Sequence, residues 1–211
     1  MTNSSLESQF NRWAPTYDRD VRDESGFPFS GYTQVLNRVI SLALIEAGTE
    51  VLELGAGTGN LTRKLVDAGA AVWALDFSSD MLAIATEKVP EAQFGQADLQ
   101  AEYPPPFQRK YNRIVSTYTF HELPLTGKLK LLCRLIDNYL VPDGIIVIGD
   151  IGFADAAARE FVGVASGEAW DDEYYWIQDE ATTALRAEGM ALTWEQISDC
   201  GVVIEITRLP Q

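Results

Sequence analysis

From Val51 onward, apolar segments typical of β-strands alternate with segments whose apolar residues recur at helical spacing. This alternation limits the fold more than any other feature of the sequence, because strands joined by helices run parallel and have both faces of their sheet covered. The expected strands are residues 50–55, 71–77, 92–98, 111–119, 144–151, 191–198 and 202–209. The expected helices between them are residues 60–69, 78–90, 125–140, 154–165 and 179–189.

The last two expected strands are separated only by residues 199–201. A parallel crossover needs about a dozen residues or more, so these two strands must be antiparallel. The sequence therefore predicts an α/β fold: a doubly wound, mostly parallel seven-stranded sheet with helices on both faces and one antiparallel strand near the C-terminus. We expect residues 49–211 to form this core and residues 1–48 to form an N-terminal helical lid packed on it, within one domain overall.

The chain is strongly acidic, with 31 Asp and Glu residues against 16 Lys and Arg residues and a net charge of -15. Such a surface repels phosphate backbones and anionic lipids, so we expect neither nucleic acid nor a membrane as a partner, and a small-molecule substrate is the expectation that remains. The N-terminus lacks the pattern of a signal peptide, and no apolar run reaches membrane-spanning length. Two isolated cysteines, Cys133 and Cys200, form no disulfide framework. We expect a cytoplasmic protein with reduced thiols.

Three glycines, Gly55, Gly57 and Gly59, occupy alternate positions directly after the first expected strand. Glycine loses more conformational freedom on folding than any other residue, so three in this register indicate a turn that a ligand approaches closely. In doubly wound sheets, ligands bind beyond the carboxyl ends of the strands, which is where this turn lies.

Two classes of ligand compete for the loop. The dinucleotide fingerprint is G-x-G-x-x-G, but here Asn60 stands where its third glycine belongs, and Glu53 is a poor neighbour for a pyrophosphate. S-adenosylmethionine has no phosphate; Glu53 would hold its ammonium group, and Asp76, at the end of the next strand, would bind its ribose hydroxyls. Asp98, after the third strand, would accept a hydrogen bond from the adenine amino group while Leu99 packs on the ring. Asp76 has an alternative role as a helix cap, and Asp98 as a solvated loop acid.

Residues 51–62, 74–82, 95–99 and 114–123 together resemble the class I S-adenosylmethionine-dependent methyltransferases, and the resemblance extends over nearly the whole chain. Residues 10–21 and 170–180 are similar to the small bacterial methyltransferases of the YrrT type. The resemblance implies S-adenosylmethionine as the cofactor. The expected cofactor-binding residues are Tyr17, Glu53, Gly55, Ala56, Gly57, Gly59, Asp76, Phe77, Met81, Asp98, Leu99 and Ser116.

His121, the only histidine, follows the fourth expected strand, where the reactive methyl group would project. An ordinary histidine pKa of about 6.5 suits a general base near neutral pH, although a role in shaping the pocket is an equal alternative. Tyr118, near the same strand end, would line the sulfonium site or serve only in packing. Many relatives have a second histidine at the position of Glu122, so the sequence leaves the role of a histidine pair open.

Two aromatic segments also favour a substrate pocket. Arg12, Trp13 and Tyr17 would belong to a lid over the cofactor, or to a helix that docks its aromatic residues on the sheet. In the second segment, four aromatic residues lie between acidic ones. They would form a wall of the substrate pocket that suits an amine or another cation, or they would be buried in the core. These four are Trp170, Tyr174, Tyr175 and Trp176.

The predicted reaction is methyl transfer from S-adenosylmethionine to a nitrogen, oxygen or sulfur atom of a small molecule by in-line displacement. No residue spacing typical of a metal site is present, so we expect a metal-independent enzyme. The alternatives are a non-catalytic S-adenosylmethionine-binding module and, third, a nicotinamide-dependent oxidoreductase. The sequence identifies neither the methyl acceptor nor the oligomeric state.

Overall fold

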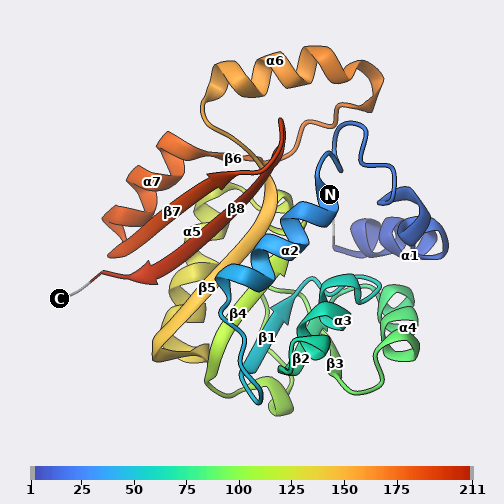
Figure 1. Ribbon diagram of the computed structural model, residues 1–211, viewed down its shortest axis with the longest axis vertical. Coiled ribbons are helices and arrows are strands. Elements are labelled where there is room, and N and C mark those ends of the chain that lie inside the picture. The colour runs from blue at the N-terminus through green and yellow to red at the C-terminus, as the bar shows by residue number, and fades with distance from the viewer. Residues whose placement is uncertain (1–2, 210–211) are drawn as a thin grey trace.

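A single mixed sheet runs through the computed structural model, which describes residues 3–209 (Figure 1). Seven strands form it in the order β3-β2-β1-β4-β5-β8-β7, and a short strand, β6, pairs with β5. The strands are β1 Glu50–Leu54, β2 Ala71–Asp76, β3 Gln93–Gln96, β4 Tyr111–Thr117, β5 Leu140–Phe153, β6 Trp176–Ile177, β7 Met190–Gln196 and β8 Gly201–Arg208. Neighbouring strands are parallel except where β8 pairs with β5 and β7, so the predicted antiparallel strand is confirmed.

The described residues contain eight strands instead of the predicted seven. The additional strand, β6, has two residues, which pair in parallel with Gly152 and Phe153 at the end of β5. A strand this short has no recognisable alternation. A second difference concerns residues 141–143, which lie between the expected helix at 125–140 and the expected strand at 144–151. They lie within β5, where the register with β4 shifts between the Tyr111 and Arg113 pairings.

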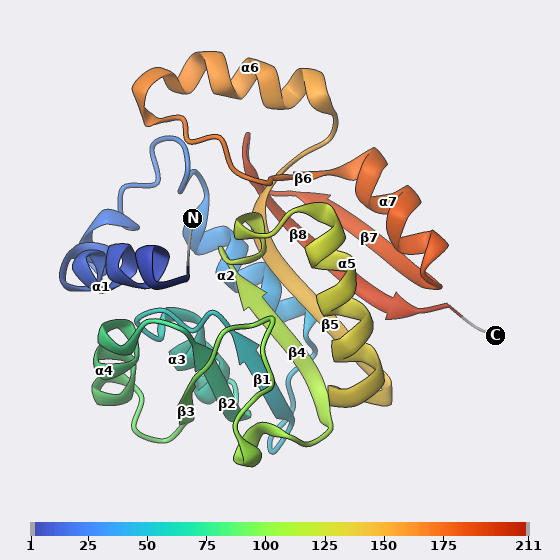
Figure 2. The ribbon, with the colours of Figure 1, turned by 180° about the vertical axis from the view of Figure 1, so that it is seen from behind.

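Helices cover both faces of the sheet (Figures 1 and 2). Helices α2 and α3 pack on one face, where Val51, Val115 and Val147 belong to their core cluster. Helices α5 and α7 pack on the other face, against Leu52 and Ile114 among others. The helices are α1 Asn3–Asp20, α2 Tyr32–Leu42, α3 Asn60–Asp67, α4 Ser79–Lys88, α5 Leu125–Arg134, α6 Ala156–Ser166 and α7 Gln178–Ala187. None of those in the described part of the chain is long and apolar enough to cross a membrane.

The carboxyl ends of β1, β2, β4 and β5 meet at one edge of the sheet because these strands are parallel. Helix α1 lies beside this edge and packs on α4 (Figure 1). The N-terminus of α4 is capped by Ser78, whose hydroxyl accepts a hydrogen bond from the backbone N–H of Met81. The edge therefore brings together the glycine loop, the residues after β2 and β4, and the N-terminal helix.

Candidate functional site

The three glycines of the loop that follows β1 have different surroundings. Gly55 has a φ of 72°, and a Cβ atom built on it would lie 2.7 Å from Cγ2 of Thr119, so a side chain is excluded there. Gly57 has a φ of 52° and lines a cavity at this edge of the sheet, the glycine-loop cavity. A Cβ atom on Gly57 would meet nothing within 4 Å. Gly59 has a φ of 83° and brings α3 close to α4, since its Cβ atom would lie 3.2 Å from that of Ala85. The open space at Gly57 is the room that a bound ligand requires.

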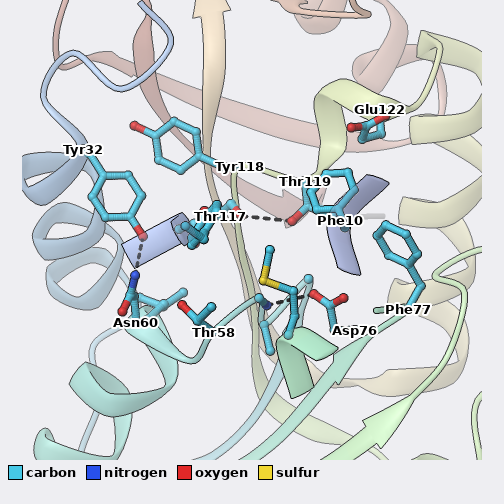
Figure 3. Close-up of a pocket in the computed structure, with 16 residues that line it drawn as sticks. Phe10, Tyr32, Thr58, Asn60, Asp76, Phe77, Thr117, Tyr118, Thr119 and Glu122 are labelled. Atoms are coloured by element: carbon cyan, nitrogen blue, oxygen red, sulfur yellow. Dashed lines mark hydrogen bonds between the residues drawn. The ribbon is translucent and has the colours of Figure 1, made fainter. Parts of the chain in front are cut away.

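Asp76 ends β2 and faces the glycine loop across the cavity (Figure 3). Its carboxylate accepts hydrogen bonds of 2.8 Å from the backbone N–H groups of Gly57 and Ser78. Burial raises the pKa of Asp76, and these backbone hydrogen bonds oppose the rise. Because each carboxylate oxygen has two acceptor sites, Asp76 can still bind the hydroxyls of a ribose. The helix-cap role that Asp76 had as an alternative is filled by Ser78.

An apolar slot lies beside Asp76. Phe77 and Met81 line it, and Phe10 of α1 closes it with its ring centroid 5.2 Å from that of Phe77. A carboxylate beside an apolar wall of Phe77, Met81 and Phe10 matches the diol and the adenine of a nucleoside. The residues present therefore fit S-adenosylmethionine.

Seven of the predicted cofactor-binding residues line this cavity: Tyr17, Gly55, Ala56, Gly57, Asp76, Phe77 and Met81. Five others lie outside its lining: Glu53, Gly59, Asp98, Leu99 and Ser116. Cofactor contacts from these five remain predictions.

Local packing explains the positions of the residues outside the lining. Glu53 is buried on the α3 side of the sheet, where the hydroxyl of Thr62 donates a 2.6 Å hydrogen bond to its carboxylate. Burial raises the pKa of Glu53 to about 8, so the carboxyl group is mostly protonated at neutral pH. Leu99 packs in the core, and the Ser116 hydroxyl donates to the Leu54 carbonyl. Asp98 is half-buried and accepts a hydrogen bond from the backbone N–H of Gln100.

A second cavity, of about 320 Å³, adjoins the first. The two share four lining residues, Phe10, Tyr17, Tyr118 and Glu122. Tyr118 stands between them with a φ of 51°, a left-handed backbone conformation that is uncommon for an aromatic residue. Its buried hydroxyl has no hydrogen-bond partner among the described residues and points away from Asp76 (Figure 3). Burial raises the pKa of Tyr118 well above its usual value, so the hydroxyl stays protonated.

His121 lies in the wall of this second cavity, in the short helix Phe120–Glu122 after β4. Its Nδ1 atom is 2.6 Å from a carboxylate oxygen of Asp150, and the other oxygen of Asp150 accepts a 2.9 Å hydrogen bond from the indole N–H of Trp176. Its Nε2 atom is 3.7 Å from a carboxylate oxygen of Glu173. Burial alone lowers the pKa of His121, but Asp150 and Glu173 outweigh that effect and raise the pKa to about 9.

Sequence reasoning missed the two partners of His121. Asp150 is a carboxylate near the end of an apolar strand, which is the signal that identified Asp76, so the sequence held the information needed. Glu173 follows no strand of the main sheet and carries no comparable signal. The ligand atoms of His121, Glu122 and Glu173 lie within 4.8 Å of one another, so a cation among them would meet all three. Residue spacing could not reveal this group, because its members come from two distant segments.

The aromatic substrate wall predicted at residues 170–176 is wrong, because none of its four aromatic residues lines either cavity. Tyr175 and Trp176 are buried, Trp170 packs on Phe27, and Tyr174 is exposed. The same segment instead places its carboxylates, Asp171 and Glu173, in the wall of the second cavity. Tyr175 and Trp176 pack into the core and Tyr174 faces outward, so the carboxylates are the side chains of this segment that reach the cavity.

Comparisons with known proteins find methyltransferases. Residues 51–144 match the family described as methyltransferase domain. The uncharacterized methyltransferase YrrT of Bacillus subtilis is 31% identical over 208 residues, covering 93% of this chain and 94% of the relative. An uncharacterized methyltransferase of Geobacillus kaustophilus is 33% identical over 200 residues, covering 89% of each chain. The crystal structure of magnesium protoporphyrin IX methyltransferase from Synechocystis, with bound SAH, has a TM-score of 0.75 at 17% identity and covers 97% of this chain and 99% of that one.

The fold, the glycine loop after β1 and the carboxylate after β2 define a class I S-adenosylmethionine-dependent methyltransferase. Within that class, the chain belongs to the YrrT-type family of methyltransferases, which it matches over almost its full length. The membership confirms the resemblance found in the sequence and does not support a nicotinamide-dependent oxidoreductase.

Proposed function

We propose that S-adenosylmethionine binds in the glycine-loop cavity and that a small molecule in the adjoining cavity accepts the methyl group. The observation that carries this proposal is that the two cavities share a wall at Tyr17 and Tyr118. When bound, S-adenosylmethionine supplies an electrophilic methyl group on a sulfonium. A cavity of about 320 Å³ is at the lower end of the range for small-molecule sites, which argues for a small acceptor.

Within this proposal, the residues of the chain have distinct roles. Asp76 binds the ribose hydroxyls, and Phe77 and Met81 hold the adenine. In its neutral form, which becomes more populated as pH rises toward its pKa of about 9, His121 takes a proton from the acceptor at Nε2, while Asp150 holds Nδ1 protonated and fixes the orientation of the ring. A nitrogen, oxygen or sulfur atom could be the nucleophile, because each gains reactivity on losing a proton.

We also propose that α1, within the first 48 residues, acts as a lid. Asp18 accepts hydrogen bonds from Thr58 and Asn60 of the glycine loop and pairs with Lys88 of α4 at 2.6 Å. Asn11 accepts a 2.6 Å hydrogen bond from the Ser78 hydroxyl. With α1 in this position the glycine-loop cavity is only about 50 Å³, well below the 300–1,000 Å³ of typical ligand sites. Entry of the cofactor therefore requires α1 to move.

The test supplies S-adenosylmethionine with a deuterated methyl group together with panels of small amines, phenols and thiols, and follows the label by mass spectrometry. We expect label in a small product. His121→Gln should lower kcat by about 10²–10⁴-fold while the Kd for S-adenosylhomocysteine stays within about twofold. Cofactor binding without any turnover would instead support a binding module, and label found only in a macromolecular fraction would contradict the small acceptor.

A further inference from the structure

We propose that the second cavity selects an amine, bound as an ammonium cation between the aromatic rings and the carboxylates of Glu122 and Glu173. This inference rests on the proposed function and names the acceptor class for the same site. It depends on the charge of the cavity, on its aromatic lining and on the position of His121.

Carboxylates outnumber basic groups in the cavity wall, where His121 is the one basic side chain among the described lining residues. Glu122, Asp171 and Glu173 line it, and no Lys or Arg of the described residues does so. Glu122 and Glu173 are only partly exposed, and burial raises the pKa of both carboxyl groups; His121 opposes the rise, and neighbouring carboxylates add to it. His121, 3.7 Å from Glu173, can balance only one of the three acids, so the remaining carboxylates favour a cationic ligand, since burying an unpaired charge is costly.

Lys128 is a buried cation near the cavity, but it does not neutralise the carboxylates of the cavity wall. Its ammonium group donates a hydrogen bond to the Tyr174 carbonyl and lies 4.7 Å from the centre of the Trp176 ring. It does not belong to the cavity lining. The space beside Glu122 and Glu173 therefore remains open to a ligand cation.

The other walls of the cavity are aromatic, and they come mostly from the N-terminal segment. The aromatic lining residues are Phe10, Trp13, Tyr17, Phe27, Phe29 and Tyr118. Ring faces attract cations, and rings on several sides combined with an acidic end are typical of sites for organic ammonium groups. An anionic acceptor would be repelled by the same carboxylates, and a neutral one would leave them unpaired.

His121 stands where the nitrogen of such a ligand would need a base. Its Nε2 atom lies 3.7 Å from Glu173, so an ammonium group held by Glu173 is within reach of the imidazole. The nitrogen exchanges one N–H bond for one N–CH₃ bond: the proton passes to Nε2 of His121 in its neutral form, whose share grows as pH rises toward its pKa of about 9, and the electron pair of the broken S–CH₃ bond stays on sulfur. Charge is conserved: the ammonium group first gives a proton to His121, its freed lone pair then accepts the methyl group, and the methylated amine is again a cation.

The test measures binding without turnover. Because His121 is the only histidine, its imidazole NMR signals are unambiguous in protein freed of any tag. Benzylamine, benzyl alcohol and benzoate, which share one ring and differ in charge, are titrated in turn. We expect benzylamine to bind at least tenfold more tightly than benzyl alcohol and to shift the His121 signals, and benzoate not to bind.

Variants locate the site. Glu173→Gln and Glu122→Gln should each weaken benzylamine binding at least tenfold, whereas Glu168→Gln, an exposed change of the same charge in the neighbouring segment, should not change it. Equal affinities for the amine and the alcohol, or no effect of Glu173→Gln, would overturn the proposal. So would Mn²⁺ or Zn²⁺ binding at His121 while benzylamine does not, because the group would then be a metal site.

S-adenosylhomocysteine is titrated into the same preparation. If it binds and benzylamine does not, the amine proposal fails while methyl transfer to another small acceptor stands. If it does not bind, the proposed function itself fails.

Discussion

Replacing Gly57 by alanine tests whether the glycine loop is shaped by the ligand or by the fold. At a φ of 52°, a non-glycine residue costs about 1–2 kcal/mol in the free energy of unfolding. Nothing lies within 4 Å of the added Cβ atom, so no packing cost is added. For a chain of this length, the loss corresponds to a fall in Tm of about 2–8 °C. The new methyl group would occupy the wall of the cavity, so the affinity for S-adenosylhomocysteine should fall at least tenfold, about 1.4 kcal/mol.

Gly55→Ala is the matched control. Its φ of 72° carries the same backbone cost, and its Cβ atom would also overlap Thr119, at 2.7 Å from Cγ2 and 2.8 Å from Cβ. Forcing an atom into packed structure adds about 1–3 kcal/mol, so the total loss should reach about 2–5 kcal/mol. Urea unfolding measures both losses, and calorimetric titration with S-adenosylhomocysteine measures the affinities of whichever variants fold.

The two variants should thus differ in opposite senses, with Gly57→Ala stable but weak in binding and Gly55→Ala clearly destabilised. The reasoning is refuted if Gly57→Ala loses as much stability as Gly55→Ala, or if it binds S-adenosylhomocysteine as tightly as the unmodified protein.

Two further variants test buried and interfacial charges. Burial raises the pKa of Glu53 to about 8, above the value in the unfolded chain. The contribution of Glu53 to the free energy of unfolding is therefore complete below the unfolded pKa and is lost as pH rises toward 8. The loss amounts to at most about 1.4 kcal/mol per pH unit. Glu53→Gln should flatten this slope in urea unfolding between pH 5 and 8.5, and an unchanged slope would show that Glu53 is ionised in the fold. Asp18→Ala removes the bonds from α1 to Thr58 and Lys88, so S-adenosylhomocysteine should dissociate several-fold faster in stopped-flow fluorescence. An unchanged rate would mean that α1 does not control access.

The sequence by itself determined the sheet and one half of the site. The direction of each strand followed from connection length, since a helix between strands allows parallel pairing and three residues do not. Gly57 and Asp76 could be placed because each lies at or shortly after the end of a strand, and the ends of parallel strands meet at one edge. Such features are local, so they can be recognised without knowing how distant segments pack.

Only the tertiary structure decided the other half of the site, the second cavity around His121. His121 meets Asp150, which comes from β5, and Glu173, which comes from the segment between α6 and α7. The aromatic residues that enclose the second cavity come mostly from the N-terminal segment, while none of the four in residues 170–176 lines it. These contacts join segments without regular spacing, and packing of the whole chain selects which side chains face the cavity. Charge and shape at the acceptor site are therefore properties of the folded protein.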